Sequence, residues 1–439
     1  MTTAENIRQP GGAFAALTSR SYRIYISGQS LANMGSWMQS IAQDWLIFEL
    51  THSSTAVGVT MALQFLPMLL LGLHAGAVAD RLSKRRILLI TQSLNATATL
   101  ALAVITISGA VRAADVYAFA LLSGLIFAFD GPARQAFVTE VVSEGKLRAA
   151  ISLNAAVFQA TRLIGPAIAS VLIATAGTGW VFALNAACYL GPTIGLLLLR
   201  PADLQPAPLA PKARSSVLAA ARYLRGRPDV CWTIFLVGML GTFGLNFPIV
   251  LTAMAKSAFG GNASTYGLFN IVLGVGSAAG AVLAGAGTRP GTRAIVTTAA
   301  IFGILQATAA LAPDLATFLV LLIAMGFVNL VCQAMANASV QLAVDPEIRG
   351  RVMGLYMLVF IGGTPIGAPI IGAVTTHYGA RTGMLVCGVI PALGAAVMAV
   401  AVARKTRQQK LARPLPASWE LLESVDWDMP VDDPLPRIS

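Results

Sequence analysis

Long apolar segments alternate with short polar connections along almost the whole chain. Each segment is long enough to cross about 30 Å of hydrocarbon as an α-helix, and most connections are too short to hold a domain. The pattern predicts twelve membrane-spanning helices, at residues 24–49, 56–79, 87–110, 115–138, 149–176, 179–199, 229–256, 265–287, 294–312, 315–341, 352–376 and 380–403.

The composition supports the same interpretation. Of the 439 residues, 56% are hydrophobic and only 11% are charged, whereas a soluble domain carries about 25% charged residues. A soluble protein this apolar would lack the polar residues needed to cover its surface. We therefore expect an all-α protein that lies in a lipid bilayer.

The basic residues indicate the orientation of the chain. With both termini in the cytoplasm, 25 of the 30 Lys and Arg residues fall on the inner side, and only Arg112, Lys256 and Arg381 fall outside. This asymmetry is typical of cytoplasmic loops, so we expect a multi-pass protein of the plasma (cytoplasmic) membrane with both termini cytoplasmic. The net charge of +11 is then explained by cytoplasmic loops that set the topology and contact anionic lipids. The cations form no stripe that would bind nucleic acid.

The two halves of the chain repeat each other. At an offset of 202 residues, Gly124, Gly165 and Gly177 align with Gly326, Gly367 and Gly379 without a gap. Parallel six-helix repeats are a mark of secondary transporters. The predicted organisation is a cytoplasmic N-terminal segment (1–22), an N-terminal six-helix bundle (23–200), a Pro- and Arg-containing cytoplasmic linker (201–228), a C-terminal six-helix bundle (229–403) and a disordered cytoplasmic tail (404–439).

The connection between the second and third segments carries the most informative motif. It reads Gly76-Ala-Val-Ala-Asp80-Arg81-Leu-Ser-Lys-Arg85-Arg, and it resembles the signature loop between helices 2 and 3 of the major facilitator superfamily. That resemblance implies the twelve-helix facilitator fold and a secondary transporter. We expect this loop to act as a cytoplasmic gate, with Arg81 or Arg85 meeting Glu140 or Glu144. The alternative is a solvated loop that only sets the topology.

Further motifs resemble the enterobactin-exporter-like and macrolide-efflux branch of that superfamily. They are the stretches 129–137, 161–170 and 350–367, of which the second keeps Gly165-Pro166 of the exporter motif. Proline removes a backbone donor and kinks a helix. The resemblance implies export of an amphipathic small molecule (a drug, siderophore or similar metabolite) by alternating access in exchange for protons. An uptake carrier or uniporter of the same fold, or a membrane scaffold without transport activity, remains the alternative.

Polar residues inside the apolar segments indicate a cavity. They recur at helical spacing in the first and tenth segments, and the seventh adds Thr242 and Asn246. The resemblance implies that these helices line the central cavity. Hydrogen bonding between packed helices is the alternative. The candidates for substrate contact are Gln29, Asn33, Ser36, Ser40, Gln43, Asn246, Asn329, Gln333 and Asn337.

Embedded charges are costly in hydrocarbon and mark functional or paired groups. Asp130, Arg134 and Arg162 form a predicted cluster in which either arginine could pair with the carboxylate, and a structural salt bridge is the other interpretation. Asp44 has no obvious cationic neighbour. Asp44 and Asp130 are the two candidates for carrying a proton.

The sequence holds no nucleotide-binding loop, nucleophile motif or metal-spaced cluster of His and Cys. We therefore expect a protein that is not an enzyme and needs no cofactor or metal. Its expected partners are a small-molecule substrate, protons and the lipid bilayer, and we expect a monomer.

Overall fold

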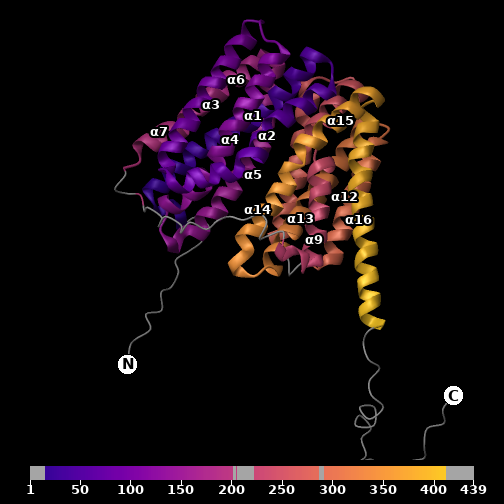
Figure 1. Cartoon of the computed structure of the whole chain (residues 1–439). Helices are drawn as coiled ribbons and strands as arrows, with labels where there is room; N and C mark the ends of the chain where they lie inside the picture. The colour runs from indigo at the N-terminus through magenta and orange to yellow at the C-terminus, as the bar shows by residue number, and fades with distance from the viewer. Residues whose placement is uncertain (1–14, 201–203, 205–221, 286–290, 412–439) are drawn as a thin grey trace, which may run out of the picture.

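The structure is a computed structural model that describes residues 15–200, 204, 222–285 and 291–411, and all regular elements in these ranges are helical (Figure 1). Most of the predicted linker, the first 14 residues and the tail after residue 411 lie outside the described residues.

The first six spans follow one another up and down. A short 3₁₀ turn, η1 (Ala15–Thr18), precedes α1, and Ser19 caps α1 by accepting a hydrogen bond from the Tyr22 amide. A second 3₁₀ turn, η2 (Glu144–Lys146), precedes α5. The spans are α1 (Arg20–Thr51), α2 (Ser54–Arg81), α3 (Lys84–Ile107), α4 (Ala113–Val141), α5 (Leu147–Ala176), and α6 (Thr178–Cys188) with α7 (Leu190–Leu198) as the sixth.

The second six spans repeat this arrangement, with two of them interrupted. The seventh is built from α9 (Pro228–Met239), a π-helical turn η4 (Leu240–Gly244), α10 (Phe247–Ala253) and a second π-helical turn η5 (Met254–Ala258). The others are α11 (Ala263–Gly285), α12 (Thr292–Ala310), α13 (Leu315–Ala343), α14 (Pro346–Gly362) with α15 (Thr364–Tyr378), and α16 (Ala380–Leu411).

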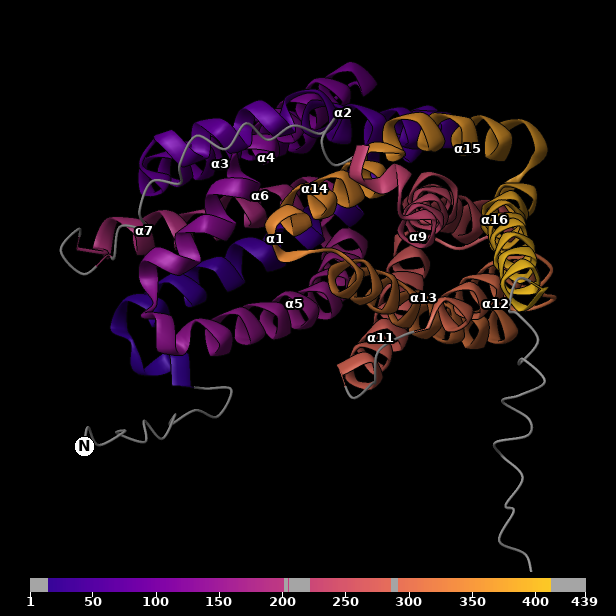
Figure 2. The same cartoon turned by 60° about the horizontal axis from the view of Figure 1, so that its bottom comes forward.

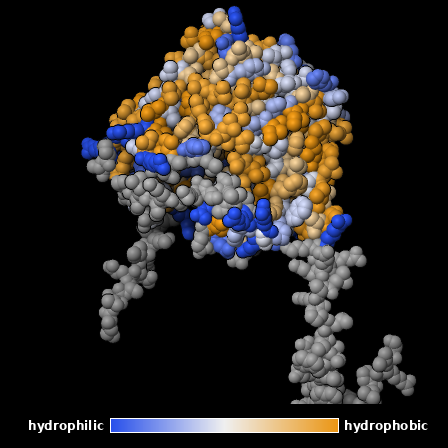
Figure 3. Space-filling view, in the orientation of Figure 1, coloured by the Kyte–Doolittle hydropathy of each residue, from blue (hydrophilic) through white to orange (hydrophobic). Residues whose placement is uncertain are grey.

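Eleven of these twelve spans are long and apolar enough to cross a membrane by length and composition alone. The exception is α1, a 32-residue helix whose polar residues set it apart from the others. The prediction of an all-α membrane protein with twelve spans is confirmed, and each predicted segment overlaps one observed span. Figure 3 shows the corresponding surface, a broad apolar belt with hydrophilic residues gathered at its upper and lower edges.

The repeat is visible in the backbone at two equivalent turns. Gly177 joins α5 to α6 with φ of 90°, and Gly379 joins α15 to α16 with φ of 92°. Residues with a side chain rarely adopt such positive φ angles. These two glycines are 202 residues apart, which is the offset found in the sequence, so each half uses the same turn between its fifth and sixth spans.

The interruption in the seventh span follows from Pro248. Proline has no amide hydrogen, so it cannot bond to the carbonyl of Gly244 four residues earlier. That carbonyl instead accepts a hydrogen bond from the buried Gln306 of α12 at 3.0 Å. The Asn246 side chain donates to the carbonyls of Thr242 and Phe243, at 2.8 and 3.0 Å. The break is therefore stabilised by specific side chains, because it would otherwise leave buried carbonyls without donors.

The twelve spans form two bundles, one from α1–α7 and one from α9–α16, which contact each other mainly through α2 with α15 and α5 with α11 (Figures 1 and 2). We call the end that holds the turns at 52–53, 177 and 379 the far end, and the opposite end, where α1 begins and α16 ends, the terminal end. The helices of the two bundles converge at the far end, at the top of Figure 1, and diverge toward the terminal end.

Candidate functional site

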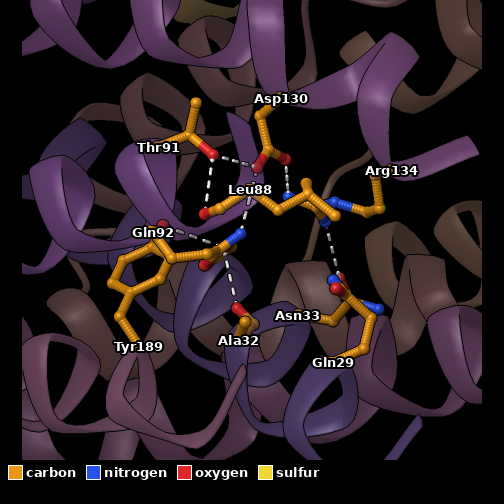
Figure 4. A network of polar contacts seen from close by, with 10 residues as sticks. Gln29, Ala32, Asn33, Leu88, Thr91, Gln92, Asp130, Arg134 and Tyr189 are labelled. Atoms are coloured by element: carbon orange, nitrogen blue, oxygen red, sulfur yellow. Dashed lines mark hydrogen bonds and ion pairs between the residues drawn. The ribbon is translucent and has the colours of Figure 1, made fainter. Parts of the chain in front are cut away.

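An ion pair between Asp130 and Arg134 lies at the centre of a polar network inside the N-terminal bundle (Figure 4). Both residues belong to α4, four positions apart, so their side chains share one helix face. Asp130 is 1% exposed, and its second carboxylate oxygen accepts hydrogen bonds from Thr91 at 2.8 Å and Gln92 at 3.0 Å, both from α3. Three donors thus stabilise the charge on this carboxylate.

The network continues into α1 through Arg134. The guanidinium donates to the side-chain oxygen of Asn33 at 3.4 Å, and the same oxygen accepts a hydrogen bond from Gln29 at 2.9 Å. Both amide side chains are buried, with exposures of 3% for Gln29 and 8% for Asn33. These two candidates for substrate contact therefore lie inside the N-terminal bundle as partners of the ion pair.

Arg162 does not join this network. Its guanidinium lies over the ring of Trp37, 5.5 Å from the ring centroid, and among the described residues it has no ion pair and no hydrogen bond. The structure therefore separates the predicted cluster into the Asp130–Arg134 pair and an isolated Arg162. The competition between the two arginines for Asp130 does not occur in this structure, because Arg162 is directed toward α1.

The second proton-carrier candidate, Asp44, lies where the two bundles meet. Its carboxylate is 5% exposed and accepts a hydrogen bond from the Tyr266 hydroxyl of α11 at 3.0 Å. The neighbouring Trp45 stacks on the Tyr266 ring with centroids 6.3 Å apart. Asp44 thus belongs to one bundle, and Tyr266, which donates the hydrogen bond to it, belongs to the other.

All side-chain hydrogen bonds that join the two bundles within the described ranges lie at the far end. Besides the Asp44–Tyr266 bond, Thr376 of α15 bonds with Ser53 and Thr55 at the start of α2, at distances of 2.9 to 3.4 Å. No ion pair between described residues crosses from one bundle to the other. Among the described residues, side-chain hydrogen bonds therefore join the two bundles at the far end and not at the terminal end.

The other polar candidates mostly bond within their own helices. On α13, Gln333 donates to Asn329 at 2.8 Å, one turn away, and Gln341 donates to Asn337 at 2.5 Å. Asn246 stabilises the interruption of the seventh span, as described above. The α1 stripe also includes Ser36, whose hydroxyl bonds to the Ala32 carbonyl and to Tyr189, half-buried Ser40 and buried Gln43.

The predicted gating contacts differ from the observed ones. Lys84 forms the ion pair with Glu140 at 2.9 Å, while Arg85 donates to the carbonyls of Leu196 and Leu197 at the end of α7. In this structure neither Arg81 nor Arg85 pairs with Glu140, because Lys84 begins α3 directly beside the end of α4. Arg81 is exposed, Gly76 lies within α2, and the side chains of Asp80 and Glu144 lie outside the described residues.

The Gly165-Pro166 pair lies within the continuous helix α5. A side chain at Gly165 would approach the Cβ atom of Trp37 to 2.7 Å. Glycine is required at this position because α5 and α1 cross closely here. The same crossing fixes Trp37 beneath the guanidinium of Arg162.

Several residues of the site were not predicted from the sequence. Thr91 and Gln92 are polar positions in an apolar segment, a signal that could have identified them. Tyr266, Tyr189 and Trp37 carry no such signal, since aromatic residues are common in membrane helices.

Comparison with known proteins agrees with this architecture. Solved structures with the same fold include a bacterial homologue of the human lysosomal transporter Spinster, with 16% sequence identity, a TM-score of 0.69 and coverage of 91% of this chain and 99% of that one. Another is the nucleoside transporter NupG, with 16% identity, a TM-score of 0.63 and coverage of 87% and 98%. Twelve spans in two six-helix bundles give this chain the fold of the major facilitator superfamily.

Within this class, the model of the transmembrane secretion effector family matches residues 11–424, and the chain belongs to that family. The resemblance to exporters of the major facilitator superfamily is thereby confirmed. The Tap multidrug efflux pump of Mycolicibacterium fortuitum is 28% identical, with 87% of this chain and 96% of that protein covered. The enterobactin exporter EntS of Salmonella choleraesuis is 25% identical, with 74% and 78% covered. The staphyloferrin A transporter of Staphylococcus aureus is 26% identical over 58% of this chain, a match that spans 64% of that protein's length.

Proposed function

We propose that this protein is a secondary active exporter that moves an amphipathic small molecule of the drug or siderophore class out of the cell in exchange for protons. The family match over residues 11–424 and the relatives named as efflux pump and exporter support the direction of transport. The excess of Lys and Arg at the terminal end supports an orientation with both termini in the cytoplasm. The protein then lies in the cytoplasmic membrane, with its far end facing outward.

The observation that carries the proton exchange is the Asp44–Tyr266 hydrogen bond between the bundles. When the far end closes, Asp44 loses water and keeps the neutral Tyr266 hydroxyl as its hydrogen-bond donor. Burying an ionised carboxylate without a cation beside it is expensive, and burying the protonated form is much less so. Closure over Asp44 is therefore coupled to proton uptake from the outer side, and the proton travels inward when the protein opens to the cytoplasm.

We assign the coupling to Asp44 rather than Asp130. The Asp130 charge is balanced by Arg134 and accepts hydrogen bonds from Thr91 and Gln92. Protonation of Asp130 is therefore unfavourable, since it would leave the Arg134 charge unpaired inside the bundle. The role of the Asp130 network is to hold α1, α3 and α4 together while the bundles move.

The loop around Gly76, Asp80, Arg81 and Arg85 is proposed to form the cytoplasmic gate that closes when the far end opens. The polar side chains of α1 and α13 that are not buried, Ser36, Ser40, Gln333 and Asn337, are proposed to border the cavity that receives the substrate. Both assignments follow from the sequence motif and the position of these helices, and Glu140 takes part in the gate through its ion pair with Lys84.

Transport by inside-out membrane vesicles tests the proposal. Vesicles with an acidic interior are given ethidium as a drug-class probe and enterobactin as a siderophore probe, and accumulation of each is measured with and without the pH gradient. We expect gradient-driven accumulation of at least one probe, which Asp44→Asn abolishes. Glu49→Gln removes an exposed carboxylate from the same helix and should leave accumulation unchanged.

Other results would contradict the proposal. Accumulation only in right-side-out vesicles would indicate an uptake carrier, and equilibration that ignores the gradient would indicate a uniporter. Unchanged accumulation in Asp44→Asn would show that Asp44 does not carry the proton.

A further inference from the structure

We infer that Arg162, together with Trp37 and Phe158, forms a binding subsite for the carboxylate of an amphipathic aromatic ligand. The inference rests on the proposed export function, since it names the chemical class of the molecule exported. It starts from the distribution of embedded charge in the structure.

Arg162 is the one embedded cation of the N-terminal bundle that lacks a counter-charge within the described residues. Arg134 is neutralised by Asp130, and Asp44 bonds with the Tyr266 hydroxyl. Arg162 has no carboxylate and no hydrogen-bond acceptor, although a guanidinium carries five N–H donors. An unpaired cation within a membrane protein is costly and is retained where it has a functional partner.

The fold itself does not require a cation at this position. The residue that corresponds to Arg162 in the second half, at the offset of 202, is Thr364, which begins α15 with a neutral side chain. In each half this position lies in the fifth span, α5 in the first half and α14 with α15 in the second. The positive charge of Arg162 is therefore not needed to form the fold, and we look for its partner among ligands.

The surroundings of Arg162 combine a cation with aromatic surface. Its guanidinium lies over Trp37, and Phe158, one turn before Arg162 on α5, meets the Trp37 ring edge-on with centroids 5.6 Å apart. The contact with the ring uses the attraction of a cation for a π face and consumes none of the N–H donors. Those donors match the two oxygens of a carboxylate, while Phe158, 43% exposed, offers an aromatic face to the rest of the ligand.

The depth of Arg162 argues for a solute and against a lipid headgroup. Arg162 lies 15 residues after the first residue of α5 and 14 before its last, which is about 22 Å from either end of the helix. Lipid phosphates lie at the edges of the bilayer, roughly 15 Å from its centre. The anion that meets Arg162 therefore belongs to a molecule that enters the interior of the protein.

A binding measurement that needs no transport tests the inference. The purified protein in nanodiscs of phosphatidylcholine is titrated with 4-butylbenzoate and with the neutral, isosteric 4-butylbenzamide, and binding is followed by tryptophan fluorescence. We expect tighter binding of the carboxylate, and a loss of about tenfold or more in its affinity in Arg162→Gln, because a charge-assisted hydrogen bond is removed. Arg162→Lys should restore part of the affinity, and Trp37→Phe should remove the fluorescence response.

The controls separate this subsite from general charge effects and from the proposed function. Arg148→Gln removes an exposed cation from the first turn of the same helix and should leave both affinities unchanged. Equal affinity for carboxylate and amide in the parent protein, or a preference that survives Arg162→Gln, would overturn the inference. A loss of carboxylate affinity in nanodiscs that contain phosphatidylglycerol would assign Arg162 to lipid and overturn it too. Selective binding without transport of any probe would refute the exporter and leave the subsite in place.

Discussion

Gly267 offers a direct test of how the far end closes. This residue of α11 packs against α5 of the other bundle, and a Cβ atom added to it would overlap the Ser170 hydroxyl and lie 2.5 Å from the Ser170 Cβ atom. The hydroxyl can rotate away, but the Cβ atom cannot. Since ordinary carbon contacts lie near 3.5–4 Å, Gly267→Ala requires the two helices to separate by about 1 Å.

The expected effect is a shift toward the state in which the far end is open. Overpacking of a close contact costs about 1–3 kcal/mol. The bundles relieve this cost by separating, so the ratio of open to closed protein should rise roughly 5- to 150-fold. Folding of each bundle should be unaffected, because the clash lies between the bundles.

The open population can be measured by chemical labelling. Ser54, 4% exposed, lies in the contact between α2 and α15 at the far end. In a background without the four native cysteines, Ser54→Cys should react with a membrane-impermeant maleimide only when the far end opens. The labelling rate should rise in Gly267→Ala by the factor above, and Ser170→Gly should return it toward the parent rate.

Gly274→Ala is the matched control, on the same helix and facing the same bundle. A Cβ atom there would lie 3.4 Å from the Leu163 side chain, an ordinary contact, so labelling should change less than about twofold. An unchanged rate in Gly267→Ala at normal expression would refute the idea that this close approach holds the far end closed.

Three further changes test the network and the loop. Asp130→Asn should destabilise the protein by about 3 kcal/mol, because removing one partner of a buried ion pair leaves Arg134 uncompensated. The thermal unfolding temperature in detergent should fall, and adding Arg134→Gln should reverse most of the fall. An unchanged unfolding temperature in Asp130→Asn would contradict this. Lys84→Glu should lower the unfolding temperature, because it places two carboxylates side by side, and the double variant Lys84→Glu/Glu140→Lys should restore it. A double variant that stays destabilised would show that the ion pair does not contribute to stability. Asp80→Asn should reach the membrane in normal amounts but lose transport in vesicles, whereas full transport would leave Asp80 only a topology role.

The fold could be predicted because membranes constrain sequences strongly. A span needs about 20 apolar residues, so the twelve segments could be recognised one by one, and the repeat linked the halves through positions such as Gly177 and Gly379. The interruption of the seventh span was not predicted. It depends on Gln306 of another helix supplying a donor to the Gly244 carbonyl, a contact that no local pattern reveals.

The site was predictable in its residue types and not in its pairings. Asp44, Asp130, Arg134 and Arg162 could be identified because charge is rare in apolar segments, and the i, i+4 spacing suggested the Asp130–Arg134 pair. Which arginine remains unpaired depends on the rotation of α5 against α1, which is set by the close approach at Gly165. The partner of Asp44 lies 222 residues away, at a distance in sequence where helical spacing carries no information.

The scarcity of polar contacts between the bundles has an energetic consequence. Each hydrogen bond between neutral groups contributes only about 0.5–1.5 kcal/mol net, and the described bundles share just the bonds of Asp44 with Tyr266 and of Thr376 with Ser53 and Thr55. For the proposed exporter, an open arrangement that differs from this one mainly by the loss of these bonds would also be populated at equilibrium. A single proton or a bound solute that prefers one arrangement by a few kcal/mol would then be enough to reverse the balance between them.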